Sequence, residues 1–237
     1  MNILALDSSD KVLSIALSVK TNIWYTEMDA AGSHSQLMLE CVDFLCKKAS
    51  FNPTELNLVS CMKGPGSFTG LRIGFSTAKG LALALGIPLV AIPTLDCIAW
   101  SFSIWPGIVI PVIDAKKGCF FSALYRQGRL IMDYADISPE SLLEAAFKAK
   151  LSPNEPFLLT GYGAPLFYSY LEPFIKKNGK EFEKYCLEDT IITDPNYNKW
   201  RAKELLEIAK NVKNNSINDI KGGPVYLRKS DAELNCK

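Results

Sequence analysis

The first patterned stretch of the chain alternates between apolar and small polar residues. From Val12 to Val19, leucine, isoleucine and valine take turns with serine and alanine. A period of two predicts a half-buried β-strand. An apolar run from Ile3 to Asp7 precedes this strand and a shorter one from Ile23 to Tyr25 follows it, with polar residues at both turns. The chain therefore predicts an opening three-stranded meander with Asp7 at its first hairpin.

The same order of segments returns in the middle of the chain. Apolar runs over Ile108–Asp114, Cys119–Tyr125 and Leu130–Met132 are separated by polar turns. Superposing Asp7 on Asp114 without gaps also superposes the strands that follow. Such self-similarity predicts an internal duplication.

Helical and strand-like segments alternate after each meander. In the first half they are helices Gln36–Ala49 and Thr69–Leu85 and strands Leu58–Met62 and Leu89–Ile92. In the second half they are helices Pro139–Ala149, Ala164–Lys176 and Lys199–Lys213 and strand Phe157–Thr160. Residues 178–198 have no clear periodicity and receive no assignment.

This pattern predicts an α/β protein with two lobes, each a mixed sheet with flanking helices. We place the lobes at residues 1–105 and 106–237. The arrangement is that of the actin, hexokinase and Hsp70 fold, in which the aspartates of the two first hairpins, here Asp7 and Asp114, face each other. Two unrelated α/β lobes with similar strands are the alternative.

A glycine-rich loop from Lys63 to Gly74 joins a predicted strand to a predicted helix. Ser67 or Thr69 can cap the free amides at the helix start, and turns of this kind can bind phosphate. The glycine spacing fits neither Walker A nor GxGxxG. We therefore favour a packing role for the loop, with anion binding as the alternative.

The two helices beside this loop have complementary surfaces. Small residues recur every four positions in the second helix, which lets another backbone approach closely. The first helix is apolar around most of its girth, whereas a surface helix needs one apolar face of about 100°. We predict that another chain covers both helices, with burial of the first helix inside this chain as the alternative. The predicted interface residues are Leu37, Met38, Cys41, Val42, Leu45, Gly70, Gly74 and Ala78.

Charge and cysteine usage narrow the function classes. The chain has 26 Lys+Arg against 25 Asp+Glu, whereas proteins that grip RNA directly have a strong basic surplus. Its cysteines are scattered without a CxxC pair, as expected of reduced cytosolic thiols. We expect no signal peptide, because the chain runs from its first residues straight into a strand-like segment, and the longest uncharged stretch is too interrupted to span a membrane. We expect a cytoplasmic protein that reaches RNA only through a partner.

His34 is the single histidine of the chain. Because there is no second histidine, the sequence excludes sites built on paired histidines, and a Ser-His-Asp triad could only use His34. No GxSxG elbow occurs elsewhere. We interpret His34 as a solvent-facing or helix-capping residue, with a catalytic role as the alternative. We predict no catalytic residue, metal site or cofactor.

Several segments resemble the motifs of the TsaB family, also called YeaZ, across essentially the whole chain. They are the opening Ile3–Ser9, the helix entry His34–Leu37, the glycine motif Gly64–Gly74 with its continuation Ala78–Leu81, Pro93–Ala99, Asp114–Gly118 and the C-terminal Pro224–Arg228. The long glycine motif is the most specific of these.

The resemblance implies an actin-like fold and a non-catalytic subunit in the synthesis of threonylcarbamoyladenosine on tRNA. It also implies a heterodimer with the catalytic paralogue TsaD through the first-lobe helices, with TsaE as the ATPase that joins them. Surplus apolar surface makes a homodimer plausible for the isolated chain.

Two other functions stay open on sequence. An ATP-dependent phosphotransferase or ATPase would use Asp7 and Asp114 in the interlobe cleft, with Ser8, Ser9, Gly161 and Gly163 as further anion or nucleotide contacts. Tyr162 stands where the family often has aspartate, and this disfavours a nucleotide role. A glycoprotease-like peptidase would depend on His34 and is disfavoured.

Overall fold

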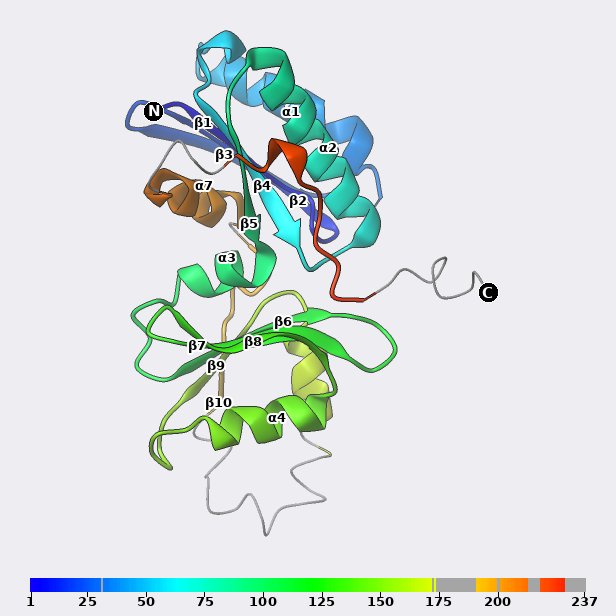
Figure 1. The fold of residues 1–237 in the computed structure, drawn as a ribbon, viewed down its shortest axis with the longest axis vertical. Helices are drawn as coiled ribbons and strands as arrows, with labels where there is room; N and C mark the ends of the chain where they lie inside the picture. The colour runs from blue at the N-terminus through cyan, green and yellow to red at the C-terminus, as the bar shows by residue number, and fades with distance from the viewer. Residues whose placement is uncertain (31, 172, 174–190, 200, 213–217, 229–237) are drawn as a thin grey trace. The chain divides into compact units, whose positions relative to one another are not determined.

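The computed structural model of the chain describes residues 1–30, 32–171, 173, 191–199, 201–212 and 218–228. The chain divides into two compact units (Figure 1). The first unit combines Met1–Cys97 with Lys199–Lys237, and the second is Ile98–Asn198.

The first unit is built on a five-stranded sheet in the order β3-β2-β1-β4-β5. Strands β1 (Ile3–Asp7), β2 (Val12–Val19) and β3 (Asn22–Asp29) form the antiparallel meander. Strands β4 (Leu58–Gly64) and β5 (Leu89–Pro93) extend it on the other side of β1 in parallel.

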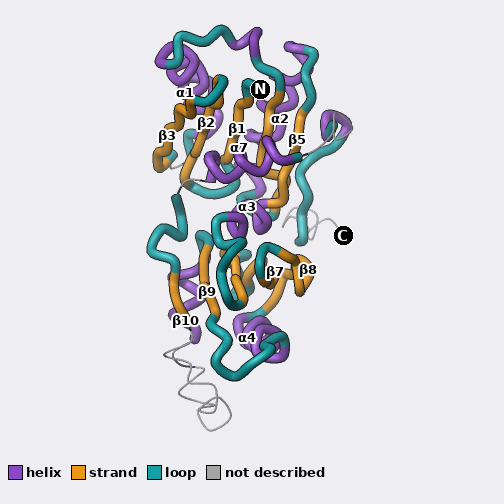
Figure 2. Tube along the Cα trace, turned by 90° about the vertical axis from the view of Figure 1, so that its left-hand side faces the viewer, coloured by secondary structure: helices purple, strands orange, loops and turns teal. Residues whose placement is uncertain are grey.

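Helices cover both faces of this sheet (Figures 1 and 2). Helices α1 (His34–Lys48) and α2 (Phe68–Leu85) lie on one face, where Leu4 and Leu6 contribute to the core. Helix α7 (Arg201–Asn211) packs on the other face, against Ile3 and Ala5. Alternate residues of β1 thus enter different cores, as the pleat of a strand requires.

Strand β2 is buried on both faces, so the prediction of a half-buried strand was wrong. Leu13, Ile15 and Leu17 face the core under α1 and α2. On the opposite face the small side chains let α7 approach, and the Ser14 hydroxyl accepts a hydrogen bond from the Ala202 amide at 3.2 Å. Small polar residues therefore marked a helix-packing face and not a solvent-exposed one.

The second unit repeats this architecture, in the strand order β10-β9-β6-β7-β8. Its meander is β6 (Ile108–Asp114), β7 (Phe120–Arg126) and β8 (Arg129–Ile137), and β9 (Phe157–Thr160) and β10 (Ile191–Thr193) pair in parallel beyond β6. Helix α4 (Pro139–Lys148) packs on the core with helical residues 164–171. The end of the predicted helix Ala164–Lys176 lies outside the described residues.

The equivalent strand orders of the two sheets confirm the predicted duplication and the two-sheet α/β fold class. The unit boundaries differ from the predicted 1–105 and 106–237, because the chain returns at Lys199 and α7 completes the first core. Two short elements had no assignment in the pattern, namely α3 (Thr94–Trp100) and β10. Short 3₁₀ turns lie at Pro53–Glu55 (η1) and Asp219–Lys221 (η3).

A buried ion pair ties together the second unit. The Arg126 Nε donates to Glu155 Oε1 at 2.7 Å, and the Leu151 amide donates to Glu155 Oε2 at 2.7 Å. Burial raises the pKa of the Glu155 carboxyl, but the hydrogen bonds from Arg126 and Leu151 outweigh burial, so the net pKa lies below its ordinary value.

The lowered pKa of Glu155 predicts a pH-dependent stability of the second unit. The ionised carboxylate stabilises the fold above the unfolded-state pKa of about 4.3, and this contribution is lost as pH falls through the lower folded-state value. We expect Arg126→Met to cost about 3 kcal/mol near neutral pH and to flatten the acid dependence. Hydrogen exchange of residues 98–171 at several pH values measures both effects, with Arg129→Met at an exposed position as the control. An unchanged acid dependence in Arg126→Met would contradict the assignment.

Candidate partner-binding site

The glycine loop after β4 packs against the first hairpin of its own unit. The Ser67 hydroxyl caps α2 by accepting from the Gly70 amide at 3.3 Å, and the Ser67 amide donates to the Ser9 carbonyl at 2.6 Å. A Cβ on Gly66 would lie 2.6 Å from the Ser9 carbonyl oxygen. The loop is therefore a close-packed joint between α2 and the turn after β1, which supports the packing interpretation.

The small-residue stripe of α2 lies against the same hairpin. A Cβ on Gly70 would overlap the Ser8 carbonyl oxygen, and one on Gly74 would overlap the Ser8 hydroxyl. The Ser8 hydroxyl donates to the Gly70 carbonyl at 2.8 Å. The backbone that the stripe was predicted to admit thus belongs to this chain.

The predicted anion contacts of the first hairpin take part in that joint. The Asp7 side chain is fully buried and accepts from the Ser9 amide at 2.8 Å and the Ser9 hydroxyl at 2.6 Å. Ser8 and Ser9 are also buried. The Asp7 carboxylate therefore accepts hydrogen bonds within the hairpin, and the Ser8 hydroxyl donates to α2.

The corresponding residues of the second unit gather at the ends of β6 and β9. The Asp114 carboxylate accepts from the Lys116 amide at 2.7 Å and pairs with the Lys116 ammonium at 2.6 Å. A Cβ on Gly161 would lie 2.6 Å from the Val112 oxygen, and one on Gly163 would lie 2.8 Å from the Asp114 nitrogen. These glycines serve close backbone packing. That Asp7 and Asp114 face each other stays a prediction.

Most of the predicted interface residues of α1 and α2 are buried within this chain. Leu37 is half-buried, but all other predicted interface residues are buried: Met38, Cys41, Val42, Leu45, Gly70, Gly74 and Ala78. They face the sheet and the first hairpin of their own unit. The sequence could not distinguish a helix face that contacts its own sheet from one that contacts another chain, because both need the same apolar or small residues.

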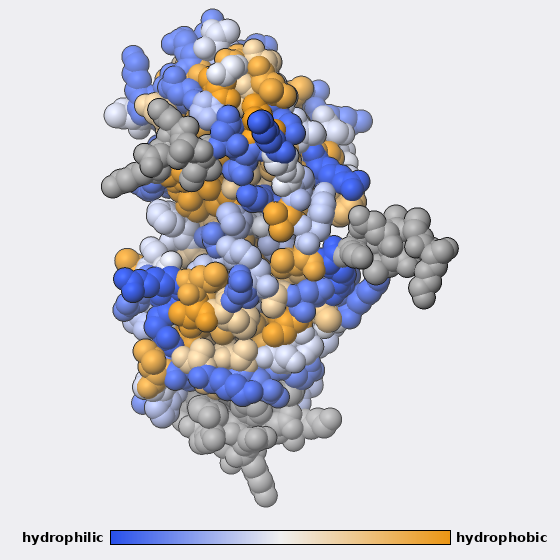
Figure 3. Space-filling view, in the orientation of Figure 1, coloured by the Kyte–Doolittle hydropathy of each residue, from blue (hydrophilic) through white to orange (hydrophobic). Residues whose placement is uncertain are grey.

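Apolar side chains nevertheless occur on the outer face of the two helices. Leu39, Phe44 and Leu83 are 54%, 51% and 61% exposed, and Leu37, Ile73 and Leu81 of the same two helices are half-buried against the core. We call these six residues the outer face. In Figure 3 orange surface is interspersed with blue where α1 and α2 lie in Figure 1. Apolar groups exposed on paired helices are typical of a protein-binding surface.

The C-terminal segment 218–226, which we call the strap, lies along α2 and the edge strand β5. Asp219 accepts from the Ala91 amide at 2.9 Å, and its other carboxylate oxygen pairs with Lys63 at 3.2 Å. The Val225 amide donates to the Lys63 carbonyl at 2.7 Å. The sequence indicated this segment only through the Pro224–Arg228 motif, and its contacts with β4 and β5 were not predicted.

His34 is buried at the start of α1, and its Nε2 lies 2.8 Å from the Asp10 carbonyl oxygen. It connects the first hairpin to the helix, so the interpretation as a solvent-facing residue was wrong.

Burial raises the pKa of the Cys61 and Cys97 thiols, which keeps them protonated and unreactive. Within the described residues, no three His, Cys, Asp or Glu side chains are grouped as a metal site would require.

Comparison with known proteins identifies the family to which this chain belongs. A family model described as "TsaD: tRNA N6-adenosine threonylcarbamoyltransferase" matches residues 27–236. The tRNA threonylcarbamoyladenosine biosynthesis protein TsaB of Bacillus subtilis is 28% identical over 76% of this chain and 79% of its own length. TsaB of Buchnera aphidicola subsp. Schizaphis graminum is 35% identical over 60% of this chain and 68% of its own length. The chain belongs to the TsaB (YeaZ) family. The family-model match and the TsaB relatives show this together.

Solved structures agree with this membership at the level of the fold. YeaZ from Pseudomonas aeruginosa superposes with a TM-score of 0.74 at 24% identity, over 95% of this chain and 99% of that one. A Bacteroides thetaiotaomicron protein with an actin-like ATPase fold gives a TM-score of 0.50 at 12% identity, over 87% of this chain and 95% of that one. This TsaB-family chain therefore has the predicted actin-like fold. None of its described helices has the length and apolar character needed to cross a membrane.

Proposed function

We propose that this chain is a non-catalytic subunit of the cytoplasmic machinery that makes threonylcarbamoyladenosine on tRNA. It binds and stabilises the catalytic paralogue TsaD and helps to recruit the ATPase TsaE. The observation that carries the proposal is the outer face of α1 and α2 in a TsaB-family chain, because apolar side chains are exposed there on a well-packed lobe.

The candidate chemical groups support a structural role for this chain. Asp7 is buried and bonded to Ser9, Asp114 is paired with Lys116, and His34 contacts a backbone carbonyl. A phosphotransferase would need the two aspartates available for a metal–nucleotide complex. The near-neutral charge of the chain also fits a subunit that meets tRNA only through its partner.

Depleting the chain from cells and quantifying threonylcarbamoyladenosine in total tRNA tests the proposal. We expect the modified nucleoside to fall, and to return when the wild-type chain is restored. We also expect the isolated chain to show no Mg-ATP turnover and no tRNA modification, whereas TsaD with the chain is active. Normal modification in depleted cells, or modification by the chain alone, would contradict the proposal.

A further inference from the structure

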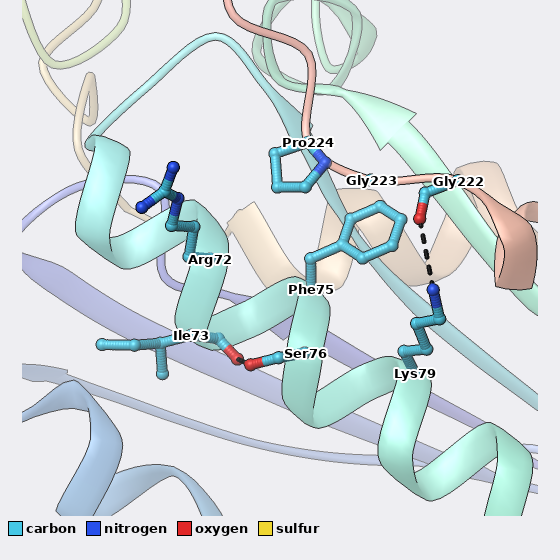
Figure 4. A pocket seen from close by; sticks show the side chains of 8 residues that line it. All are labelled: Arg72, Ile73, Phe75, Ser76, Lys79, Gly222, Gly223 and Pro224. Atoms are coloured by element: carbon cyan, nitrogen blue, oxygen red, sulfur yellow. Dashed lines mark hydrogen bonds between the residues drawn. The ribbon is translucent and has the colours of Figure 1, made fainter. Parts of the chain in front are cut away.

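A hollow of about 410 Å³ lies on the first unit between α2 and the strap (Figure 4). Its lining residues are Arg72, Ile73, Phe75, Ser76, Lys79, Gly222, Gly223 and Pro224. Figure 4 shows Arg72 and Lys79 at opposite ends, with Phe75 and Pro224 between them. The hollow therefore has an apolar middle, two cationic ends and no acidic side chain among its lining residues.

Arg72 is held in place although it is exposed. Its guanidinium carbon lies 3.9 Å from the centre of the Phe68 ring, and its Nε donates to the Tyr226 hydroxyl at 3.2 Å. The Phe68 and Tyr226 rings also contact each other, with centroids 4.5 Å apart and planes tilted by 36°. An arginine ordered by two aromatic rings has already lost much of its rotamer freedom, so less entropy is lost when a ligand binds it.

Neither cation has a carboxylate partner within the part of the chain that the structure describes. The Arg72 Nε donates to the Tyr226 hydroxyl, and the Lys79 ammonium donates to the Gly222 carbonyl at 3.5 Å. The nearby Asp219 is engaged by Lys63 and the Ala91 amide. The terminal nitrogens of Arg72 are therefore suited to a bidentate acceptor from outside the chain.

We propose that this hollow receives an acidic side chain and an adjoining apolar residue from a partner protein. This inference rests on the proposed function, and the partner is the catalytic paralogue. Charge complementarity favours a carboxylate, and the apolar middle favours a neighbouring apolar side chain. Arginine also binds phosphate in the bidentate manner, but the apolar Phe75 and Pro224 between the two cations favour a protein segment over a small phosphate ligand.

The hollow also continues the outer face, because Ile73 belongs to both. A partner that covers α1 and α2 would thus reach the strap without a break. Arginine in such a position is a common binding hot spot. The strap accordingly contributes to the interface by positioning Arg72 and closing one side of the hollow.

Affinity measurements between the full chain and the catalytic paralogue test the inference. We expect Arg72→Glu to weaken binding at least about thirtyfold and Arg72→Lys to weaken it less, because lysine cannot bind a carboxylate in the bidentate manner. Lys79→Glu should weaken binding and Arg129→Glu, the same charge change at an exposed position of the second unit, should not. Tyr226→Phe, which removes only the hydroxyl that orients Arg72, should give a smaller loss and serves if Arg72→Glu fails to fold.

Two further measurements identify the occupant. A zero-length carbodiimide should couple Lys79 to an aspartate or glutamate of the paralogue, and the coupled peptide should be absent in Lys79→Gln. Titration of the isolated chain with inorganic phosphate and with ATP should show no saturable binding that Arg72→Glu abolishes. Such binding, or unchanged affinity in both charge-reversal variants, would overturn the inference. If the wild-type chain does not bind the paralogue at all, the proposed function itself fails.

Discussion

Gly70→Ala is expected to destabilise the first unit by about 3 kcal/mol or more, the largest loss of stability that we predict for a single methyl group. The added Cβ would overlap the Ser8 carbonyl oxygen, and it would also approach the Ser67 side chain at 3.3 Å. Backbone atoms cannot swing aside as a flexible side chain can, so relief requires α2 to move away from the first hairpin. Overpacking commonly costs about 1–3 kcal/mol, and rigid surroundings raise this cost. Urea unfolding followed by circular dichroism measures the change.

Gly80 of the same helix provides the matched control. A Cβ there would meet no atom within 4 Å, so Gly80→Ala should stabilise the chain by about 0.5–1 kcal/mol through helix propensity alone. The two variants carry the same chemical change in one helix and are expected to shift the urea midpoint in opposite directions. A Gly70→Ala variant as stable as the wild type would show that α2 does not pack on the hairpin as described.

The second large effect is expected on partner binding. Leu39→Glu and Leu83→Glu should each weaken binding to the catalytic paralogue about a hundredfold. Binding would bury an unpaired carboxylate, and the loss of its hydration is unfavourable. Both side chains are more than half exposed in the free chain, at 54% and 61%, so the stability of the chain should change by less than about 0.5 kcal/mol. Isothermal titration calorimetry with the purified paralogue measures the affinity.

Two controls separate binding from folding. Leu151 is 80% exposed on the second unit, and Leu151→Glu should leave the affinity unchanged. Leu45 is buried on the core-facing side of α1 at 2% exposure, so Leu45→Glu should unfold the first unit and would not report on the interface. Full affinity in both outer-face variants would rule out this side of α1 and α2 as the docking surface.

The interface assignment shows where reasoning from sequence stopped. The apolar residues around α1 and the four-residue spacing of small residues on α2 predict that other segments pack against these helices. They do not state what covers them, because a sheet of the same chain and a helix of a partner provide equivalent apolar or backbone surface. The structure identifies what packs on α2. The hairpin at Ser8 is distant from Gly70 in sequence, but its carbonyl oxygen occupies the space that a Cβ on Gly70 would need.

The division into units shows the same limit from another side. The pattern of leucine and serine in β2 identified the strand with its correct ends. It could not reveal that α7, which the sequence predicted as a helix over Lys199–Lys213, returns to the first sheet and buries the small face of β2. The boundary at residue 105 therefore assigned α7 to the wrong neighbours.

The sequence by itself determined the duplicated meanders and the positions of α1 and α2, because local periodicity and turn chemistry depend on residues close together in the chain. It favoured a packing role for the glycine loop, and its motifs indicated the family by resemblance. Only the tertiary structure decided which helix faces remain open, that α7 belongs with the first sheet, and that the strap orders Arg72 beside a hollow. Those features arise from contacts between segments far apart in sequence, and local pattern carries no record of which segments meet.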